Sequence, residues 1–162
     1  MGFAANVLVG VATLSIKYPI GGVYVDVGYT EDGVKFEYSV DKTQIRVEEK
    51  TYPLTQVINT EDLKVTANLA EATLHNLFVA IAGASQVGNI ITIGNGVDKE
   101  MSVKIVGINP AGFARTVEIP CAVASGTVGL SWRKNEKTVI PVTFDALESP
   151  AGNLCTITDA VA

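Results

Sequence analysis

At 162 residues the chain is long enough for one domain with a substantial core, and we treat residues 1–162 as a single domain. Its formal net charge of −5 and its lack of a Lys/Arg cluster argue against affinity for nucleic acid, and no apolar run approaches the roughly 20 residues of a membrane-spanning helix. Hydrophobic residues make up 48% of the chain and charged residues only 18%. Typical domains are about 25% charged, so we expect much of the surface to be buried in an assembly.

Two strands are predicted before residue 34. The first covers residues 7–18, ends at Pro19 and is followed by a Gly21-Gly22 turn. A second, short strand starts at Val23 and runs into an acidic turn at residues 31–33.

The stretch from Val34 to Leu69 dominates the organisation of the chain. Apolar residues alternate with polar ones in both of its halves, at Val34, Phe36, Tyr38 and Val40 and again at Leu63, Val65, Ala67 and Leu69. The alternation slips by one residue at 41–44 and at 59–62. The stretch therefore predicts one long antiparallel hairpin, in which Val34 faces Leu69 and Ile45 faces Ile58, with a bulge or bend at the slips.

This hairpin is too long to be covered by its own domain. A strand from Val34 to Lys50 would extend about 55 Å, whereas a compact domain of this size is roughly 40 Å across. The distal half then needs another surface, and a second copy of the same chain is the simplest source. We therefore predict a subunit interface formed by Ile45, Val47, Tyr52, Pro53, Leu54 and Ile58. The alternative is a meander of two shorter strands.

A helical period follows the hairpin. Ala70, Leu74, Leu77, Phe78 and Ile81 fall on one face, Asn68 and Glu71 have the spacing of a capping box, and Gly83 can end the helix. We predict one helix over residues 69–82 that covers a face of a sheet, with His75 on its outer side. Further strands are predicted at 90–93, 101–108, 113–124, 140–146 and 154–158, with Trp132 near a strand end. The fold class is mainly β with one flanking α-helix.

The sequence offers no catalytic, cofactor-binding or metal-binding constellation. His75 is the single histidine, so Ser-His-Asp and Cys-His arrangements lack their partners. Cys121 and Cys155 are too few for a disulfide framework or a zinc site and are expected to be reduced. Acidic pairs such as Glu48-Glu49 lack the alternating ligands of a calcium loop. We expect no enzyme activity and no cofactor.

Several segments, in their order along the chain, resemble bacteriophage tail tube (major tail) proteins, which are related to contractile-tail and type VI secretion tube proteins. Residues 26–34, DVGYTEDGV, are similar to the D-V-G-x-T-x-G-G-x turn ahead of the long hairpin in that family, although Asp32 replaces the first of the paired glycines. The long hairpin, a helix entry at 70–77 and a closing strand at 141–147 follow in the family's order.

The resemblance implies a β-sandwich or barrel-like subunit with a protruding hairpin. Such subunits would form hexameric rings whose sheets close into one inner barrel, and the rings would stack into a tube for genome delivery. The chain would then be a structural virion protein of the tail, assembled in the host cytoplasm. Implied partners are further copies of the chain and tape measure, terminator, baseplate or sheath proteins, with DNA passing through the lumen without specific binding and no membrane contact. The alternative is another ring-forming β-rich component, such as a tail terminator or a pyocin or type VI secretion-like tube.

Overall fold

The computed structural model describes residue 8 and residues 10–161. These residues form ten strands and one helix: β1 (Thr13–Lys17), β2 (Tyr24–Asp26), β3 (Thr30–Ile45), β4 (Thr55–Leu69), α1 (Leu74–Ala80), β5 (Ala84–Val87), β6 (Ile90–Ile93), β7 (Glu100–Ile108), β8 (Ala114–Ser125), β9 (Ile140–Ala146) and β10 (Thr156–Asp159). The predicted mainly β class with one helix is confirmed. None of the helical structure in the described residues is long and apolar enough to span a membrane.

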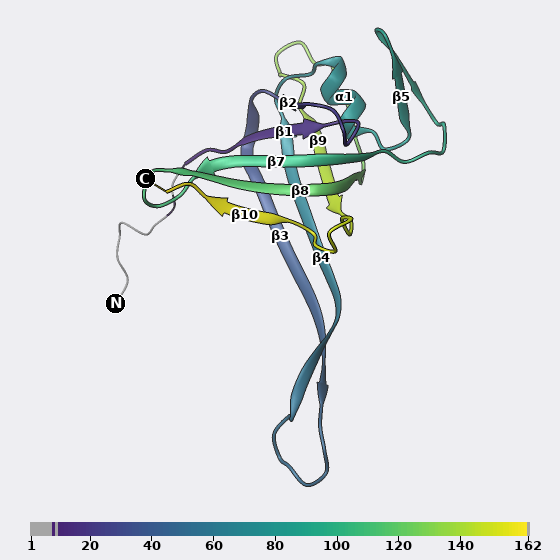
Figure 1. Ribbon diagram of the computed structural model, residues 1–162. Coiled ribbons are helices and arrows are strands. Elements are labelled where there is room, and N and C mark those ends of the chain that lie inside the picture. The colour runs from purple at the N-terminus through teal and green to yellow at the C-terminus, as the bar shows by residue number, and fades with distance from the viewer. Residues whose placement is uncertain (1–7, 9, 162) are drawn as a thin grey trace.

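One antiparallel sheet of eight strands forms the body. Its order is β2-β1-β7-β8-β9-β4-β3, and β10 pairs with β8 next to β9. Strands β1, β7, β8 and β10 run across the body, whereas β3 and β4 cross them steeply and continue below it (Figure 1). Strand β9 joins the two directions because it pairs with both β8 and β4. The sheet therefore folds over itself and encloses a core between strands that run nearly at right angles.

The core is built from residues that alternate with exposed or half-buried ones along the strands. Such alternation places one set of side chains on the inner face of each strand. The largest fully buried side chains include Leu14 and Ile16 of β1, Val65 and Leu69 of β4, Met101 and Val103 of β7, Ile119 of β8, and Ile140, Val142 and Phe144 of β9. Phe144 pairs with Val65 on one side and with Ala124 on the other, so it lies at the junction of the two strand directions.

The long hairpin exists, but its register differs from the predicted one. Val34 pairs with Ala67 rather than Leu69, and Ile45 pairs with Thr55 rather than Ile58. The connecting turn spans residues 46–54, so its centre lies earlier in the chain than the symmetry of the sequence pattern indicates. A bulge between Glu31 and Val34 also adds an offset at the base. In the basal half the observed register differs from the predicted one by two residues. Because this number is even, the side chains of that half lie on the predicted faces.

The predicted slip in the middle of the hairpin is confirmed as a bulge. The register shifts between Asp41, which pairs with Thr60, and Lys42, which pairs with Ile58. Asn59 is the extra residue of β4, and its amide donates hydrogen bonds to Asp41 Oδ2 at 3.1 Å and to Thr43 Oγ1 at 2.6 Å. The predicted register would place Asp41 opposite Asp62, but Asp62 pairs with Ser39.

Helix α1 is shorter than the predicted span of residues 69–82. Leu69 still belongs to β4, and Thr73 rather than Asn68 caps the helix by accepting a hydrogen bond from Asn76 N at 3.2 Å. Glu71 lies outside the helix, where its carboxylate accepts from Tyr29 N at 3.2 Å and fills the space where Gly28 lacks a Cβ. Glu71, which the sequence pattern assigned to a capping box, therefore makes a tertiary contact with the turn before β3.

A buried amide fixes the position of α1 on the body. Asn76 is 2% exposed, and its Nδ2 donates to Val27 O and to Glu71 O, both at 2.8 Å. Because an unpaired buried carbonyl costs about 1–3 kcal/mol, this side chain links the helix firmly to the segment after β2. The helix buries Phe78, Val79 and Ala80, while Leu74, which was predicted to face inward, is 37% exposed.

Two alanine substitutions on α1 test this orientation. Phe78→Ala should lower the free energy of unfolding by about 3–5 kcal/mol, because it removes a buried ring and leaves a cavity. Leu74→Ala should change it by about 0.5 kcal/mol or less, since that side chain is at the surface. Urea denaturation of both variants measures the difference. Equal losses would contradict the observed helix orientation.

Candidate assembly surface

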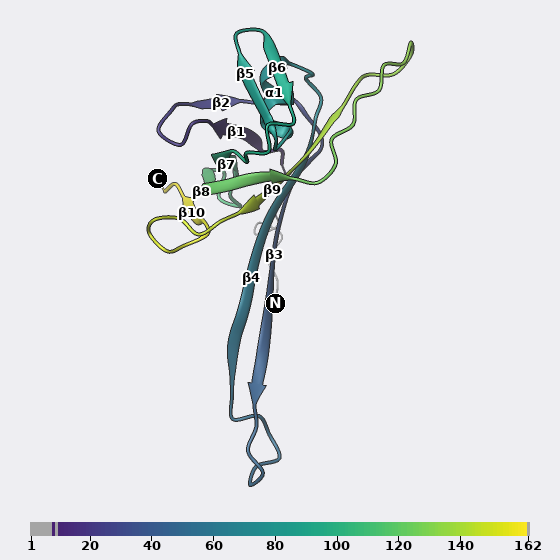
Figure 2. The same cartoon turned by 90° about the vertical axis from the view of Figure 1, so that its right-hand side faces the viewer.

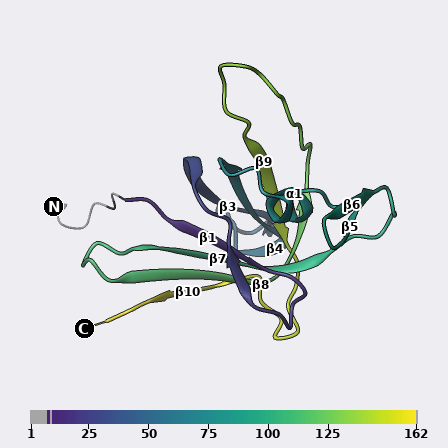
Figure 3. The same cartoon turned by 90° about the horizontal axis from the view of Figure 1, so that it is seen from above.

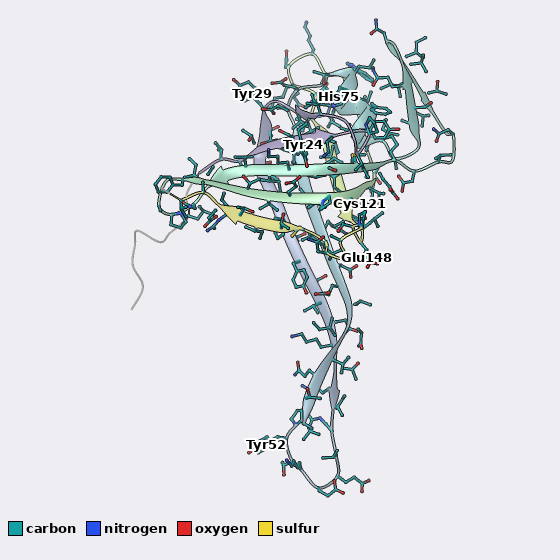
Figure 4. The ribbon with its side chains drawn as sticks, viewed as in Figure 1. Tyr24, Tyr29, Tyr52, His75, Cys121 and Glu148 are labelled. Atoms are coloured by element: carbon teal, nitrogen blue, oxygen red, sulfur yellow. The ribbon has the colours of Figure 1, made fainter. Side chains whose placement is uncertain are left out.

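The distal half of the β3–β4 hairpin stands clear of the body. The views in Figures 1 and 2 agree that it extends alone, and Figure 4 places Tyr52 at its far end. Every residue from 35 to 52 and from 54 to 62 is exposed. Of the six residues predicted to form a subunit interface, Pro53 is half-buried, and the exposed five are Ile45 (42%), Val47 (36%), Tyr52 (80%), Leu54 (54%) and Ile58 (51%).

The pairing places these residues on both faces of the hairpin. Ile45 shares a face with Val57, since the pairs Ile45–Thr55 and Thr43–Val57 lie two residues apart. Ile58 lies on the other face, opposite Lys42. The predicted pairing of Ile45 with Ile58 is therefore wrong, because the bulge at Asn59 shifts only β4. Both faces of the distal hairpin present apolar side chains.

A further apolar strip continues from the distal hairpin toward the body. Phe36, Tyr38 and Val40 of β3 are 37%, 51% and 38% exposed, although the residues that pair with the first two, Val65 and Leu63, are buried. Phe36 and Tyr38 also line a groove with Leu154 and Ile157, from the segment that leads into and forms β10. Phe36, Tyr38 and Val40 share one face of β3. One edge of that strand has no partner strand within the described sheet.

Polar contacts hold the hairpin in shape without covering it. Tyr38 Oη donates to Glu61 Oε1 across the strands at 2.5 Å, and this hydrogen bond raises the pKa of the exposed Tyr38 phenol. Lys35 and Glu37 form an exposed ion pair at 2.7 Å. Exposed pairs of this kind contribute about 0–1 kcal/mol. They leave the apolar side chains of the hairpin accessible.

A second projection is the loop of residues 126–139 between β8 and β9. It extends from the end of the body opposite the hairpin (Figure 2). The prediction of a strand end at Trp132 is wrong, because Trp132 lies within this loop and is 82% exposed. An isolated bridge joins Arg133 to Glu136, and their side chains form an ion pair at 2.9 Å. Lys137 reaches back to Glu31 of β3 at 3.1 Å.

Strands β5 and β6 form a third projection, which the sequence reasoning missed in part. Strand β6 was predicted, but β5 was not, and together they make a separate two-stranded ribbon beside α1 (Figure 3). Val87 and Ile90, which flank its turn, are 80% and 69% exposed. The sequence did contain a sign of an apolar surface segment here, because no charged residue occurs from residue 83 to 97.

The single histidine and the two cysteines lie on different parts of the fold, with His75 in α1, Cys121 in β8 and Cys155 just before β10. Among the residues that the structure describes, no three His, Cys, Asp or Glu side chains lie close enough together to hold a metal ion. His75 is half-buried rather than on an outer face, and its buried Nε2 has no partner in the described structure. This burial lowers the pKa of His75. Cys121 and Cys155 are unbonded thiols whose pKa values are raised by burial, so both are protonated at neutral pH.

Comparison with known proteins gives structural matches but no sequence match. No protein-family model and no curated protein sequence matches the chain. A chain from the extended sheath-tube complex of an extracellular contractile injection system, PVC, superposes with a TM-score of 0.58 at 12% identity, over 93% of this chain and 89% of that one.

Two further structures align over most of the chain with lower scores. A chain from the tail of an empty GTA particle, refined with C6 symmetry, has a TM-score of 0.48 at 6% identity and covers 92% of this chain and 95% of its own. A crystal structure of Hcp protein has a TM-score of 0.33 at 12% identity, with coverage of 92% and 98%. The match to the PVC complex confirms that the chain has the fold that the resemblance to tail tube proteins implies.

Proposed function

We propose that the chain is a structural subunit that assembles with further copies of itself into rings, and that these rings stack into a tube. The observation that carries this proposal is the distal β3–β4 hairpin, whose apolar side chains lie on both faces and have no cover from the described residues of the chain. A two-stranded hairpin is marginally stable alone in water, so a hairpin of this length calls for contacts with other subunits.

The edges of the sheet support the same proposal. Strands β2 and β3 end the sheet order, and each leaves one edge without a partner strand in the described structure. Exposed edges of long apolar strands promote association with other chains, and closure of a sheet into a ring removes them. A hexameric ring in which the sheets join into one inner barrel would pair the β3 edge and cover Phe36, Tyr38 and Val40.

The remaining features fit a structural role without chemistry. The groups that could carry catalysis are scattered, with His75 at α1 and Cys121 in β8 (Figure 4). We propose a tail tube of a phage virion, assembled in the host cytoplasm, with tape measure, terminator, baseplate and sheath proteins as further partners. The likeness to a chain of the PVC sheath-tube complex favours a second candidate, the tube of a contractile injection or secretion particle.

Electron microscopy of wild-type protein and a hairpin variant tests the proposal. The wild type should form rings or tubes. Replacing residues 42–59 by Asn-Gly should abolish assembly, because the interface loses Ile45, Val47, Ile58 and the Tyr52-Pro53-Leu54 tip, each worth roughly 1.5–3 kcal/mol when fully buried. The pair Asp41–Thr60 still closes the shortened hairpin, and the two-residue Asn-Gly turn suits it.

The same variant separates assembly from folding. Its thermal unfolding should stay close to that of the wild type, because the removed side chains contribute little to the core of their own subunit. An unfolded variant would assign the distal residues to that core, as in the meander alternative. A variant that still forms normal tubes, or a wild type that remains monomeric at high concentration, would contradict the proposed function.

Duplex DNA should pass such a tube without being retained. Five of the 12 Lys and Arg residues already form ion pairs with carboxylates, among them Arg115 with Asp159 at 2.6 Å and Lys64 with Asp145 at 3.8 Å. The remaining seven Lys and Arg residues belong to a chain with a net charge of −5, so we expect weak contacts with phosphates, whose effect would multiply around a ring. Co-sedimentation of assembled protein with linear DNA at about 0.15 M salt should leave the DNA in the supernatant. Strong co-sedimentation would argue against a neutral or acidic lumen.

A further inference from the structure

The β5–β6 ribbon has the properties of a protein interface. It extends from the body beside α1, and its turn carries exposed Val87 and Ile90 (Figures 1 and 3). Ile93 and Val97 at its base are 65% and 66% exposed. A surface strand pair usually carries charges that discourage contact with other chains, yet residues 83–97 contain none. The ribbon is therefore suited to burial against a partner.

The base of the ribbon is held rigidly, so its direction is fixed before any contact forms. Gly94 N donates to Gly83 O at 2.9 Å and closes the ribbon. Lys99 is 5% exposed, and its Nζ donates hydrogen bonds to the carbonyls of Ile81, Ala82 and Ala84. The same Nζ lies 4.5 Å from the centre of the Phe78 ring. A projection that is held in this way loses little conformational entropy when it binds.

An apolar groove lies at the other end of the body. A cavity of about 280 Å³ opens between the segment just before β1, the start of β3 and the adjoining ends of β7 and β8. Its apolar lining is formed by Leu8, Val11, Val34, Ile105, Ile108 and Val117. Three of these residues are well exposed, with Leu8 at 57%, Val11 at 87% and Ile108 at 52%. Arg115 also borders the groove, but both arms of its guanidinium bind Asp159, at 2.6 and 2.7 Å.

The ribbon cannot reach the groove of its own chain. Strand β7 starts at Glu100, just after the ribbon, and ends at Ile108 in the groove, so its 9 residues separate the two surfaces by about 30 Å. Figures 1 and 3 show the ribbon and the β7–β8 turn at opposite ends of the body. Two complementary surfaces at opposite ends of one subunit allow a head-to-tail contact, which repeats from copy to copy and closes into a ring when the rotation permits.

We propose that the β5–β6 ribbon of one subunit inserts the apolar side chains of its turn into the β1–β3–β7 groove of the next subunit, and that this contact closes the ring. The proposal rests on the proposed function, since it requires self-assembly, and it adds the ribbon–groove contact to the β3 edge and the distal hairpin as a contact that ring closure needs. Each subunit then uses its ribbon once and its groove once. The second copy is the favoured occupant because both surfaces are apolar, bear no free charge and lie at the two ends of the same strand.

Crosslinking between engineered cysteines tests the contact directly. Ile90→Cys together with Ile108→Cys, treated with a short bis-maleimide, should give a ladder of crosslinked oligomers that ends in a closed species. A mixture of the two single variants should stop at dimers, because each chain then has one reactive end. Val87→Cys with Val11→Cys repeats the test at a second register. Wild-type protein under the same treatment controls for Cys121 and Cys155.

A charge in the ribbon provides an independent test. Ile90→Asp should raise the protein concentration needed for ring assembly by roughly tenfold or more, because each contact loses the burial of an isoleucine and gains an unpaired charge. Its melting temperature should match that of the wild type, since Ile90 is 69% exposed in the single subunit. The control variant Ile90→Val keeps an apolar branched side chain and should assemble as the wild type does.

The possible outcomes distinguish this inference from the proposed function. If the wild type forms rings but neither cysteine-pair variant gives a ladder, or if Ile90→Asp forms rings normally, the ribbon contact is overturned and the tube function stands. Dimers from a single-cysteine variant alone would also overturn it, because they indicate a two-fold contact. A wild type that never forms rings would contradict both.

Discussion

The mismatch between the length of the β3–β4 hairpin and the size of the body constrains the rest of the structure. Strand β3 has 16 residues and β4 has 15, so at about 3.3 Å per residue each extends roughly 50 Å. The body covers only one face of β4, from Leu63 to Leu69. Beyond that point the apolar residues of both strands are exposed, and the proposed burial between subunits would also account for the low charge of the whole chain.

The body is organised to hold this hairpin from one side. Phe144 of β9 fills the junction between the two strand directions, and β9 pairs with β4 along the buried part of the hairpin. Helix α1 covers the body above this junction, where Asn76 ties it to Val27 and Lys99 ties its end to the ribbon. The three projections, namely the hairpin, the ribbon and the loop that carries Trp132, therefore start from one rigid core, which suits the proposed contacts with several neighbours.

Sequence periodicity predicted the features that depend on local alternation, and it failed where a tertiary contact decides the outcome. The class of the fold, the hairpin and its bulge followed from period-2 patterns at residues such as Val34 and Leu63. The register did not, because the centre of the nine-residue turn and the offset at Glu31 leave no trace in the alternation. The helix began late because Glu71 binds Tyr29 N instead of capping. Ile45 and Ile58 lie on opposite faces because of the bulge at Asn59, which shifts the side chains of β4 alone.

The central claim is that the distal hairpin becomes buried between subunits, and amide hydrogen exchange measures this most directly. Exchange would be followed across residues 42–58 in dissociated and in assembled protein, with the buried strand β9 as an internal reference. Within the single subunit these amides belong to the exposed distal part of the β3–β4 hairpin and should exchange quickly. We predict that assembly slows their exchange by about tenfold or more, while β9 stays unchanged. Equal exchange across residues 42–58 in the two states would contradict the account.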